Sequence, residues 1–528
     1  MAPDSFARYC RKIARRFLLT AVLVDDELFV STGPPAGGEL KRPERSVSAR
    51  PAATSAGRDS PPPWPIDIDP ITRSFARHGM VCGVVTPQEG QGDYEDIARA
   101  VARADIVILD WWLSRTPRAN ALPLLKRILG EDQPHRLRLI AFYTGEPDHR
   151  LIREEIAGGL GDLDAPDRPA STEEDGAIDF GACRIVVYAK PDSRTLEQSA
   201  IVAEEDLAHR LVGDFASMVQ GLLPGLVLTA LAAVRENVHR VLAHFGRDLD
   251  PAFLTHRACL PLPADSEQHI VEQIASELHG VMNDAVGGES PAGIEAIRHW
   301  LGSRFEEDCI EFGPGKEMSH AEVLEMLEHG IGEKHGPFRK GGRDYHLLSQ
   351  GFSGDTENGR ELDHRLASAM DFRQVVVDTP RQLSMGTVVR CRGDGSAMLL
   401  CATPRCDSVR LTEKSSFVFL PLADPTADTA QVVVPTGQDK HRRMAISMNP
   451  VEWLIRRFDP DPDRQCVLAD GDGPDQIFVF RDADDREYEW VGELKPEFAQ
   501  SLAQLIADRM SRIPLNRSEW LRRSARSG

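Results

Sequence analysis

Acidic, hydroxyl and ammonium side chains follow short apolar runs at four places in the first 222 residues. Asp25 and Asp26 come directly after one run in VLVDDE, and Asp110 follows another in VILDWW. Thr144 ends a third run in IAFYTGEP, and Lys190 follows a fourth in VVYAKP. Clustered carboxylates repel one another and raise each other's pKa, so three acids held together suit a divalent cation. Mg²⁺ fits, because it prefers hard oxygen ligands and keeps waters that a phosphate oxygen can replace.

The same residue types suit the transfer of a phosphoryl group. In-line transfer needs a positioned nucleophile and compensation of the charge on the equatorial oxygens. The Asp110 carboxylate can be the nucleophile, while the Lys190 ammonium and the Thr144 hydroxyl can bind phosphoryl oxygens. The product would carry about −1.5 to −2 charge, which is enough to rearrange the loops around it.

These residues can meet only if a parallel sheet places them at one edge. Aliphatic runs alternate with amphipathic stretches over the first 222 residues, which is typical of a doubly wound sheet. Ligands of such sheets bind beyond the carboxyl ends of the strands, where all five residues fall. We expect strands at 17–24, 80–85, 105–109, 137–143 and 184–189, with helices at 94–103, 121–129, 149–157 and 207–223.

The remaining chain has a different texture. Two segments rich in Gly, Pro, Ser and charge, at 31–68 and 158–182, are predicted loops. We expect three domains: a doubly wound α/β domain over 1–222, a helical middle domain over 223–366 and an α+β domain over 367–528. The predicted elements are helices at 226–245, 269–285, 321–329 and 496–513, and strands at 375–377, 386–390, 397–401, 416–422, 431–434 and 477–480.

Charge and cysteine content exclude several classes of protein. The 62 basic and 82 acidic side chains leave a formal charge of −20, which disfavours nucleic acid and anionic membrane surfaces unless a basic patch is segregated. Outside the N-terminus, the longest apolar run falls short of the roughly 18 residues that span a bilayer. Nine cysteines without a paired framework indicate reduced thiols. We therefore expect a cytoplasmic protein that binds neither nucleic acid nor membrane.

The acids, hydroxyl and lysine at these strand ends resemble the response-regulator receiver domain of two-component signalling, over residues 1–222. The resemblance implies an α/β fold class with a flavodoxin-like (βα)5 doubly wound domain, Mg²⁺ as cofactor and a sensor histidine kinase as partner. It also implies a role for each residue: Asp110 is the phosphoacceptor, Asp25, Asp26 and the backbone carbonyl of Trp112 bind the metal with Asp110, Thr144 is the switch hydroxyl and Lys190 binds phosphate.

The chain departs from the receiver pattern at the switch aromatic and at Trp111 and Trp112, which are unusually bulky beside a phosphorylation site. The switch aromatic of typical receivers lies three residues before the lysine, but Val187 stands there and Tyr188 follows on the opposite face of the strand. Conventional coupling to Thr144 is therefore not expected. An indole of Trp111 or Trp112 that shields the acyl phosphate from water would make the phosphorylated form long-lived. Glu146 could instead orient a hydrolytic water.

Two further segments narrow the resemblance. CATPRCDSVRL at 401–411 and SEWLRR at 518–523, with the unusual receiver, resemble atypical receivers of bacterial conflict systems. The layout is similar to the phosphate-buffer receiver component of the Detocs antiphage defence system. That resemblance implies a kinase that phosphorylates both a toxic sister effector with a similar receiver and this component, which drains accidental signal.

Three functions stay open at this point. The leading one is a phosphoacceptor that is not itself an enzyme and acts as a phosphate sink. The first alternative is an effector enzyme with an unrecognised active site in 224–528, switched on by phosphorylation of Asp110. The second is a degenerate receiver that serves as a scaffold. The oligomeric state is also open, a homodimer included.

Overall fold

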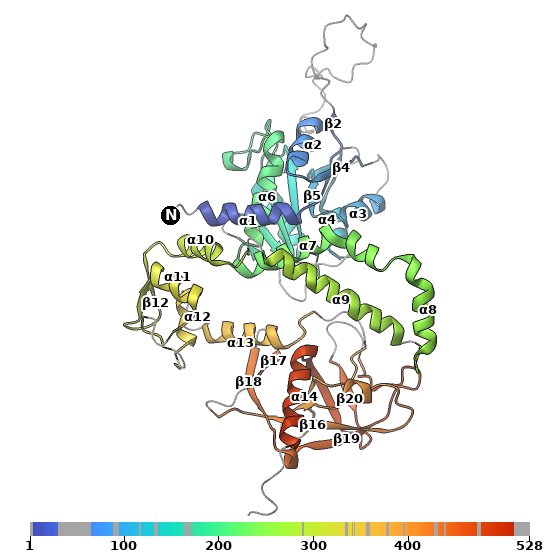
Figure 1. Ribbon diagram of the computed structural model, residues 1–528. Coiled ribbons are helices and arrows are strands. Elements are labelled where there is room, and N and C mark those ends of the chain that lie inside the picture. Colours follow the sequence, from blue (N-terminus) through green and yellow to red (C-terminus); the bar gives the residue numbers. More distant parts are fainter. Residues whose placement is uncertain are drawn as a thin grey trace, which may run out of the picture. The chain divides into compact units, whose positions relative to one another are not determined.

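The computed structural model divides the chain into two compact units, Met1–Glu306 and Glu307–Gly528 (Figure 1). The predicted domain boundaries after residues 222 and 366 stay a prediction. The residues that the structure describes are 4–29, 65–87, 94–115, 118–130, 136–161, 163, 171–173, 175–263, 265–287, 290–332, 336–339, 342, 344–354, 359–375, 380–393, 397–426, 431–437, 440–471 and 477–511.

The first unit is built on a seven-stranded sheet with the order β4-β1-β5-β8-β11-β10-β9. Its first five strands are parallel neighbours. Taken in chain order, they form the sequence 2-1-3-4-5, which is the flavodoxin-like order of doubly wound sheets. The predicted fold class is therefore confirmed. The parallel strands are β1 (Thr20–Val24), β4 (Val81–Val85), β5 (Ile106–Leu109), β8 (Arg138–Thr144) and β11 (Cys183–Ala189).

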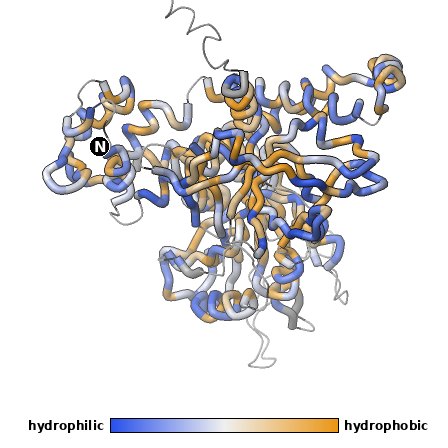
Figure 2. Tube along the Cα trace, turned by 90° about the horizontal axis from the view of Figure 1, so that it is seen from below, coloured by the Kyte–Doolittle hydropathy of each residue, from blue (hydrophilic) through white to orange (hydrophobic). Residues whose placement is uncertain are grey.

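The central strands are aliphatic because both faces of the sheet are covered. Every residue of β5, β8 and β11 is buried, as expected for parallel strands between two helical layers. Helices α3 (Glu95–Val101), α4 (Leu122–Gly130) and α5 (His149–Leu160) contribute to the apolar cluster on one face. Helices α1 (Asp4–Phe17), α2 (Ile68–Arg77) and α6 (Leu207–Met218) contribute to the other. Figure 2 shows the hydropathy of each residue along the chain.

The first predicted strand is wrong at its start, because Phe17 ends helix α1 and the strand begins at Thr20. Phe6, Cys10 and Ala14 lie four residues apart and are buried on one side of α1. That spacing is typical of a helix with one apolar face. The basic residues between them hid the helical pattern.

The predicted loops contain regular structure. Of the first, 31–64 lies outside the described residues, whereas β3 (Ile66–Asp67) pairs with β2 (Leu28–Phe29) and Ile68 begins α2. The Asp67 side chain caps α2 by accepting from the Asp69 amide. In the second, β10 (Ile178–Phe180) and β9 (Ser171–Thr172) extend the sheet in antiparallel fashion. Residues 162, 164–170 and 174 lie outside the described part.

Long helices complete the first unit. The predicted helices at 226–245 and 269–285 are α7 (Leu222–His244) and α9 (Asp265–Val286), joined through α8 (Asp250–Cys259), and α10 (Ile294–Arg304) follows. The helix predicted at 207–223 is shorter, since α6 ends at Met218 and α7 begins at Leu222. No single described helix is long and apolar enough to cross a membrane, although a pair bent by 119°, Glu204–Met218 with Leu222–Cys259, passes on length and composition.

The second unit combines helices with an antiparallel sheet of eight strands, in the order β17-β18-β16-β15-β14-β21-β20 with β19 beside β16. A hairpin, β12 (Cys309–Glu311) with β13 (Glu317–Ser319), precedes its helices. Of the predicted strand at 375–377, Val375 is irregular and the rest lies outside the described residues. The other elements are α11 (His320–His329), α12 (His346–Ser353), α13 (Gly359–Asp371), β14 (Thr387–Cys391), β15 (Met398–Cys401), β16 (Ser415–Ala423), β17 (Val432–Gly437), β18 (Lys440–Ile446), β19 (Leu454–Phe458), β20 (Val479–Arg481), β21 (Glu487–Glu493) and α14 (Pro496–Ser511).

Candidate functional site

Three acids meet at the carboxyl edge of the parallel sheet. Strands β1 and β5 lie side by side with Val24 opposite Leu109, so the residues that follow them are neighbours. The Asp110 amide donates to the Val24 carbonyl at 3.0 Å. One carboxylate oxygen from each of Asp25, Asp26 and Asp110 lies within 4.8 Å of the other two. The structure therefore brings together the three acids singled out in the sequence.

Lys190 lies between two of these acids. Its Nζ donates to Oδ2 of Asp25 and to Oδ2 of Asp110, each at 2.8 Å, and the side chain is buried. Its backbone amide donates to the Thr144 carbonyl at 2.9 Å, which fixes the end of β11 against β8. Burial opposes the charge, but the carboxylates of Asp110 and Asp25 outweigh it and raise the pKa of Lys190. The side chain is therefore an ammonium at neutral pH.

The cluster carries more negative than positive charge. Asp25 is fully buried, and its Oδ1 accepts from the Glu27 amide at 2.7 Å. Burial, followed by repulsion from Asp110, raises the pKa of Asp25 to about 7 against the opposing effect of Lys190. Oδ1 of Asp110 is buried and accepts no hydrogen bond from any described residue. One ammonium thus faces three carboxyl groups, an arrangement that suits a bound cation.

Thr144 is the last residue of β8 and lies beside the end of β11, with Ala189 as its partner in the register. Its side chain is buried, and Oγ1 accepts from the Glu146 amide at 3.3 Å. Within the described residues its hydroxyl makes no hydrogen bond to the three acids or to Nζ of Lys190. Its role as the switch hydroxyl stays a prediction.

The two indoles after Asp110 differ in their surroundings. Trp111 is buried, with its ring edge-on to Phe142 at 5.6 Å between centroids. Trp112 begins β6 (Trp112–Arg115), and its Nε1 donates to Oε1 of Glu146 at 2.7 Å. This bond was not predicted, because 34 residues separate its partners. The assignment of the Trp112 carbonyl as a metal ligand stays a prediction.

The aromatic on β11 faces away from the usual switch position, as predicted. Val187 packs in the cluster with Phe142, whereas Tyr188 packs in the cluster on the opposite face. The Tyr188 hydroxyl donates to Oδ2 of Asp214 at 2.7 Å and accepts from Nε of Arg210 at 2.8 Å. Burial raises the pKa of Asp214. Tyr188 is thus tied to α6 and is not placed to swing toward Thr144.

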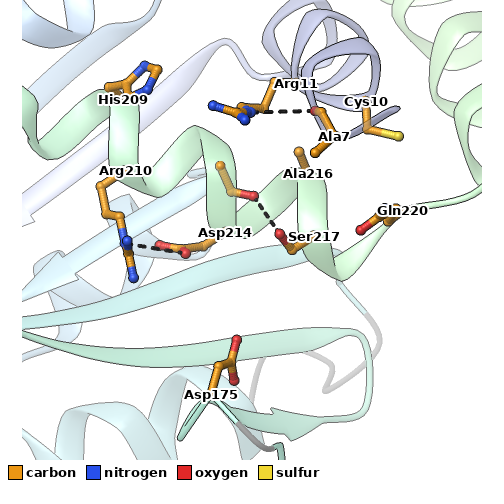
Figure 3. A pocket seen from close by; sticks show the side chains of 11 residues that line it. Ala7, Cys10, Arg11, Asp175, His209, Arg210, Asp214, Ala216, Ser217 and Gln220 are labelled. Atoms are coloured by element: carbon orange, nitrogen blue, oxygen red, sulfur yellow. Dashed lines mark hydrogen bonds and ion pairs between the residues drawn. The ribbon is translucent and has the colours of Figure 1, made fainter. Parts of the chain in front are cut away.

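A polar pocket of about 370 Å³ opens beside this network, between α1 and α6 (Figure 3). Figure 3 shows Arg210 paired with Asp214 on α6, and Arg11 and Cys10 on α1. Asp175 lines the same pocket, so both signs of charge face it. None of the three clustered acids lines it. We assign it no ligand.

Residues 17–195 match the family model of the response receiver domain. No curated protein and no solved structure matches the chain. The matched range contains the three acids, Thr144 and Lys190, and it leaves the long helices and the second unit uncovered. A receiver domain implies phosphoacceptor function and a phosphodonor partner such as a histidine kinase.

Proposed function

We propose that residues 17–195, as a response receiver domain, accept a phosphoryl group from a sensor histidine kinase on Asp110. The observation that carries this proposal is the buried ammonium of Lys190, which holds one oxygen of Asp110 at 2.8 Å beside two further acids. The other Asp110 oxygen accepts no hydrogen bond from the described residues and is available for reaction. A purely structural ion pair would not need three carboxylates for one lysine.

The residues present fit Mg²⁺. Three carboxylates converge within 4.8 Å, and their excess negative charge needs neutralising. Asp25, Asp26 and Asp110 would hold the ion, and the Trp112 carbonyl completes the proposed ligand set. When bound, Mg²⁺ would neutralise the acids and the oxygens of the incoming phosphoryl group.

The chain's own residues supply the rest of the reaction. An oxygen of Asp110 attacks phosphorus, the new O–P bond forms, and the N–P bond of the phosphohistidine breaks with its electron pair leaving on the imidazole. Lys190 orients the Asp110 carboxylate for this attack by holding its Oδ2 at 2.8 Å. Afterwards the same ammonium remains beside the new phosphoryl oxygens, and Thr144 lies at the neighbouring strand end.

Replacing the proposed metal ligand Asp26 should lower the affinity for Mg²⁺ without lowering the stability of the fold. In Asp26→Asn we expect Mg²⁺ affinity to fall about 100-fold, because one of three charged ligands is lost. The metal-free variant should be more stable than the wild type by about 1 kcal/mol, since like-charge repulsion is relieved. Mg²⁺ titration followed by tryptophan fluorescence, with urea unfolding, measures both. Asp96→Asn, whose side chain is 99% exposed, is the matched control, and equal Mg²⁺ affinities would contradict the ligand assignment.

Trp112 should slow the loss of the phosphoryl group. Its indole Nε1 donates a hydrogen bond to Glu146, the carboxylate proposed to orient a hydrolytic water. In Trp112→Phe we expect the half-life of the phosphorylated protein to fall about tenfold, because the Glu146 carboxylate loses its hydrogen bond to the indole. Removing the phosphodonor and following the phosphorylated band on a phosphate-affinity gel measures this. Adding Glu146→Gln should restore the long half-life, and an unchanged single variant would contradict the role of the indole.

We further propose that the protein is a cytoplasmic phosphate sink in a bacterial antiphage two-component system, with no catalytic output of its own. Support comes from the resemblance of 401–411 and 518–523 to the buffer component; the second of these segments lies outside the described residues. The partners would be the kinase and a sister effector. In a mixture of all three, the wild type should lower effector phosphorylation and Asp110→Asn should not. Toxicity or nucleotide loss on phosphorylation of this protein would favour the effector enzyme instead.

A further inference from the structure

From the second half of α7 through α8 and α9, the chain forms a helical arm with almost no interior. All buried residues of α7 lie at or before Ala233. None of the described residues of α8 is buried, and in α9 Ser266 is the single buried one among those described. Helix α9 packs chiefly on α7. Most helical stability in proteins comes from packing of an apolar face, so an arm with so few buried side chains calls for a further packing partner.

One exposed side of α7 carries an apolar stripe along the length of the helix. Its large side chains there are between 45% and 69% exposed. Successive members are four, four, seven and four residues apart, which keeps them within about 100° of the helix circumference. On α9, Val271 is 62% exposed. An uninterrupted apolar stripe of this kind marks an interaction surface. The members on α7 are Leu223, Val227, Leu231, Val238 and Leu242.

Helices α7 and α9 pack together as a helical hairpin, and the dimensions of this α7–α9 hairpin match those of a second copy of it. Helices α7 and α9 have 23 and 22 residues and so are each about 33 to 35 Å long. Two adjacent helices about 10 Å apart present a face of roughly 600 to 700 Å², which approaches the ~800 Å² per partner of a standard interface. Two such faces packed together make a four-helix bundle.

The acidic residues of α9 indicate which partner can pack on the α7–α9 hairpin and in which orientation. Helix α9 contains five acidic residues and no lysine or arginine, which disfavours nucleic acid and anionic membranes as occupants. A two-fold axis across the helices would stack α9 on α9 and oppose like charges. An axis parallel to the helices stacks α7 of one chain on α9 of the other and avoids this repulsion.

We infer that two copies of this chain associate through their α7–α9 hairpins into an antiparallel four-helix bundle. In light scattering after gel filtration the wild type should have twice the chain mass of 58.4 kDa. In the double variant Leu231→Glu, Leu242→Glu, the dimer dissociation constant should rise about 100-fold or more, since charges replace apolar contacts. The single substitution Val271→Glu should also weaken the dimer, because α9 of one copy packs on α7 of the other.

The control is Val451→Glu, an apolar residue of the second unit that is 89% exposed; this variant should remain dimeric. Circular dichroism of all variants verifies that the helices are retained. A monomeric wild type at micromolar concentration would overturn the inference. So would a dimer that is insensitive to both the α7 and the α9 substitutions, or sedimentation of the monomer with anionic lipid vesicles.

Discussion

The Asp110→Asn protein is expected to stay folded and to take up phosphoryl groups at least about 10³-fold more slowly than the wild type, because an amide is not a nucleophile. The substitution is nearly isosteric, and Lys190 keeps its second partner, Asp25, at 2.8 Å. It also removes one of three mutually repelling charges. A small phosphodonor with Mg²⁺, followed by a phosphate-affinity gel, compares the two rates.

Asp96→Asn, on the exposed side of α3, should be phosphorylated like the wild type. Equal labelling of Asp110→Asn and the wild type would place the acceptor elsewhere. A wild type that takes no label from a small donor or from the kinase, and that binds neither Mg²⁺ nor beryllofluoride, would favour the scaffold.

The Lys190→Met protein is expected to lose about 3 kcal/mol of unfolding free energy when Mg²⁺ is absent, a large part of the ~5–15 kcal/mol typical of a domain. The reason is that Asp25 and Asp110 remain buried without their shared ammonium. Mg²⁺ should return part of that stability, because it neutralises the same carboxylates. Phosphoryl transfer should slow about 100-fold even in the folded protein. Urea unfolding of the receiver with chelator and with Mg²⁺ measures the stability term.

Lys414→Met is the matched control, since Lys414 pairs with Asp459 on the surface at 3.4 Å. Its stability should change by less than about 1 kcal/mol. Equal effects of the two substitutions, or no response of Lys190→Met to Mg²⁺, would contradict the electrostatic account of the cluster.

The receiver fold and the cluster were predictable from the sequence because both depend on local patterns. Each parallel strand is an aliphatic run that ends where a polar residue appears, and the carboxyl ends of such strands share one edge. Asp25, Asp110 and Lys190 therefore converge without any long-range information. Helix α1 was not predicted although Phe6, Cys10 and Ala14 have helical spacing, because the basic residues between them obscure the apolar face.

Features that depend on distant partners were not predictable in the same way. The bond from Trp112 to Glu146 and the bond from Tyr188 to Asp214 join different elements and leave no local signature. Strands β9 and β10 form because β11 offers an edge, while their own segment has the composition of a loop. In the second unit, β18, β19 and β21 were missed because charged residues interrupt the apolar pattern of these strands.

The most direct test of the central claim is to locate the phosphoryl group on the chain. The protein is treated with a small phosphodonor and Mg²⁺ and then reduced with borohydride, which converts an aspartyl phosphate to homoserine. Peptide mass spectrometry then gives the position. The account predicts homoserine at Asp110 and its loss when Mg²⁺ is chelated. Homoserine at Asp25 or Asp26, or labelling at Asp110 that is indifferent to chelation, would contradict it.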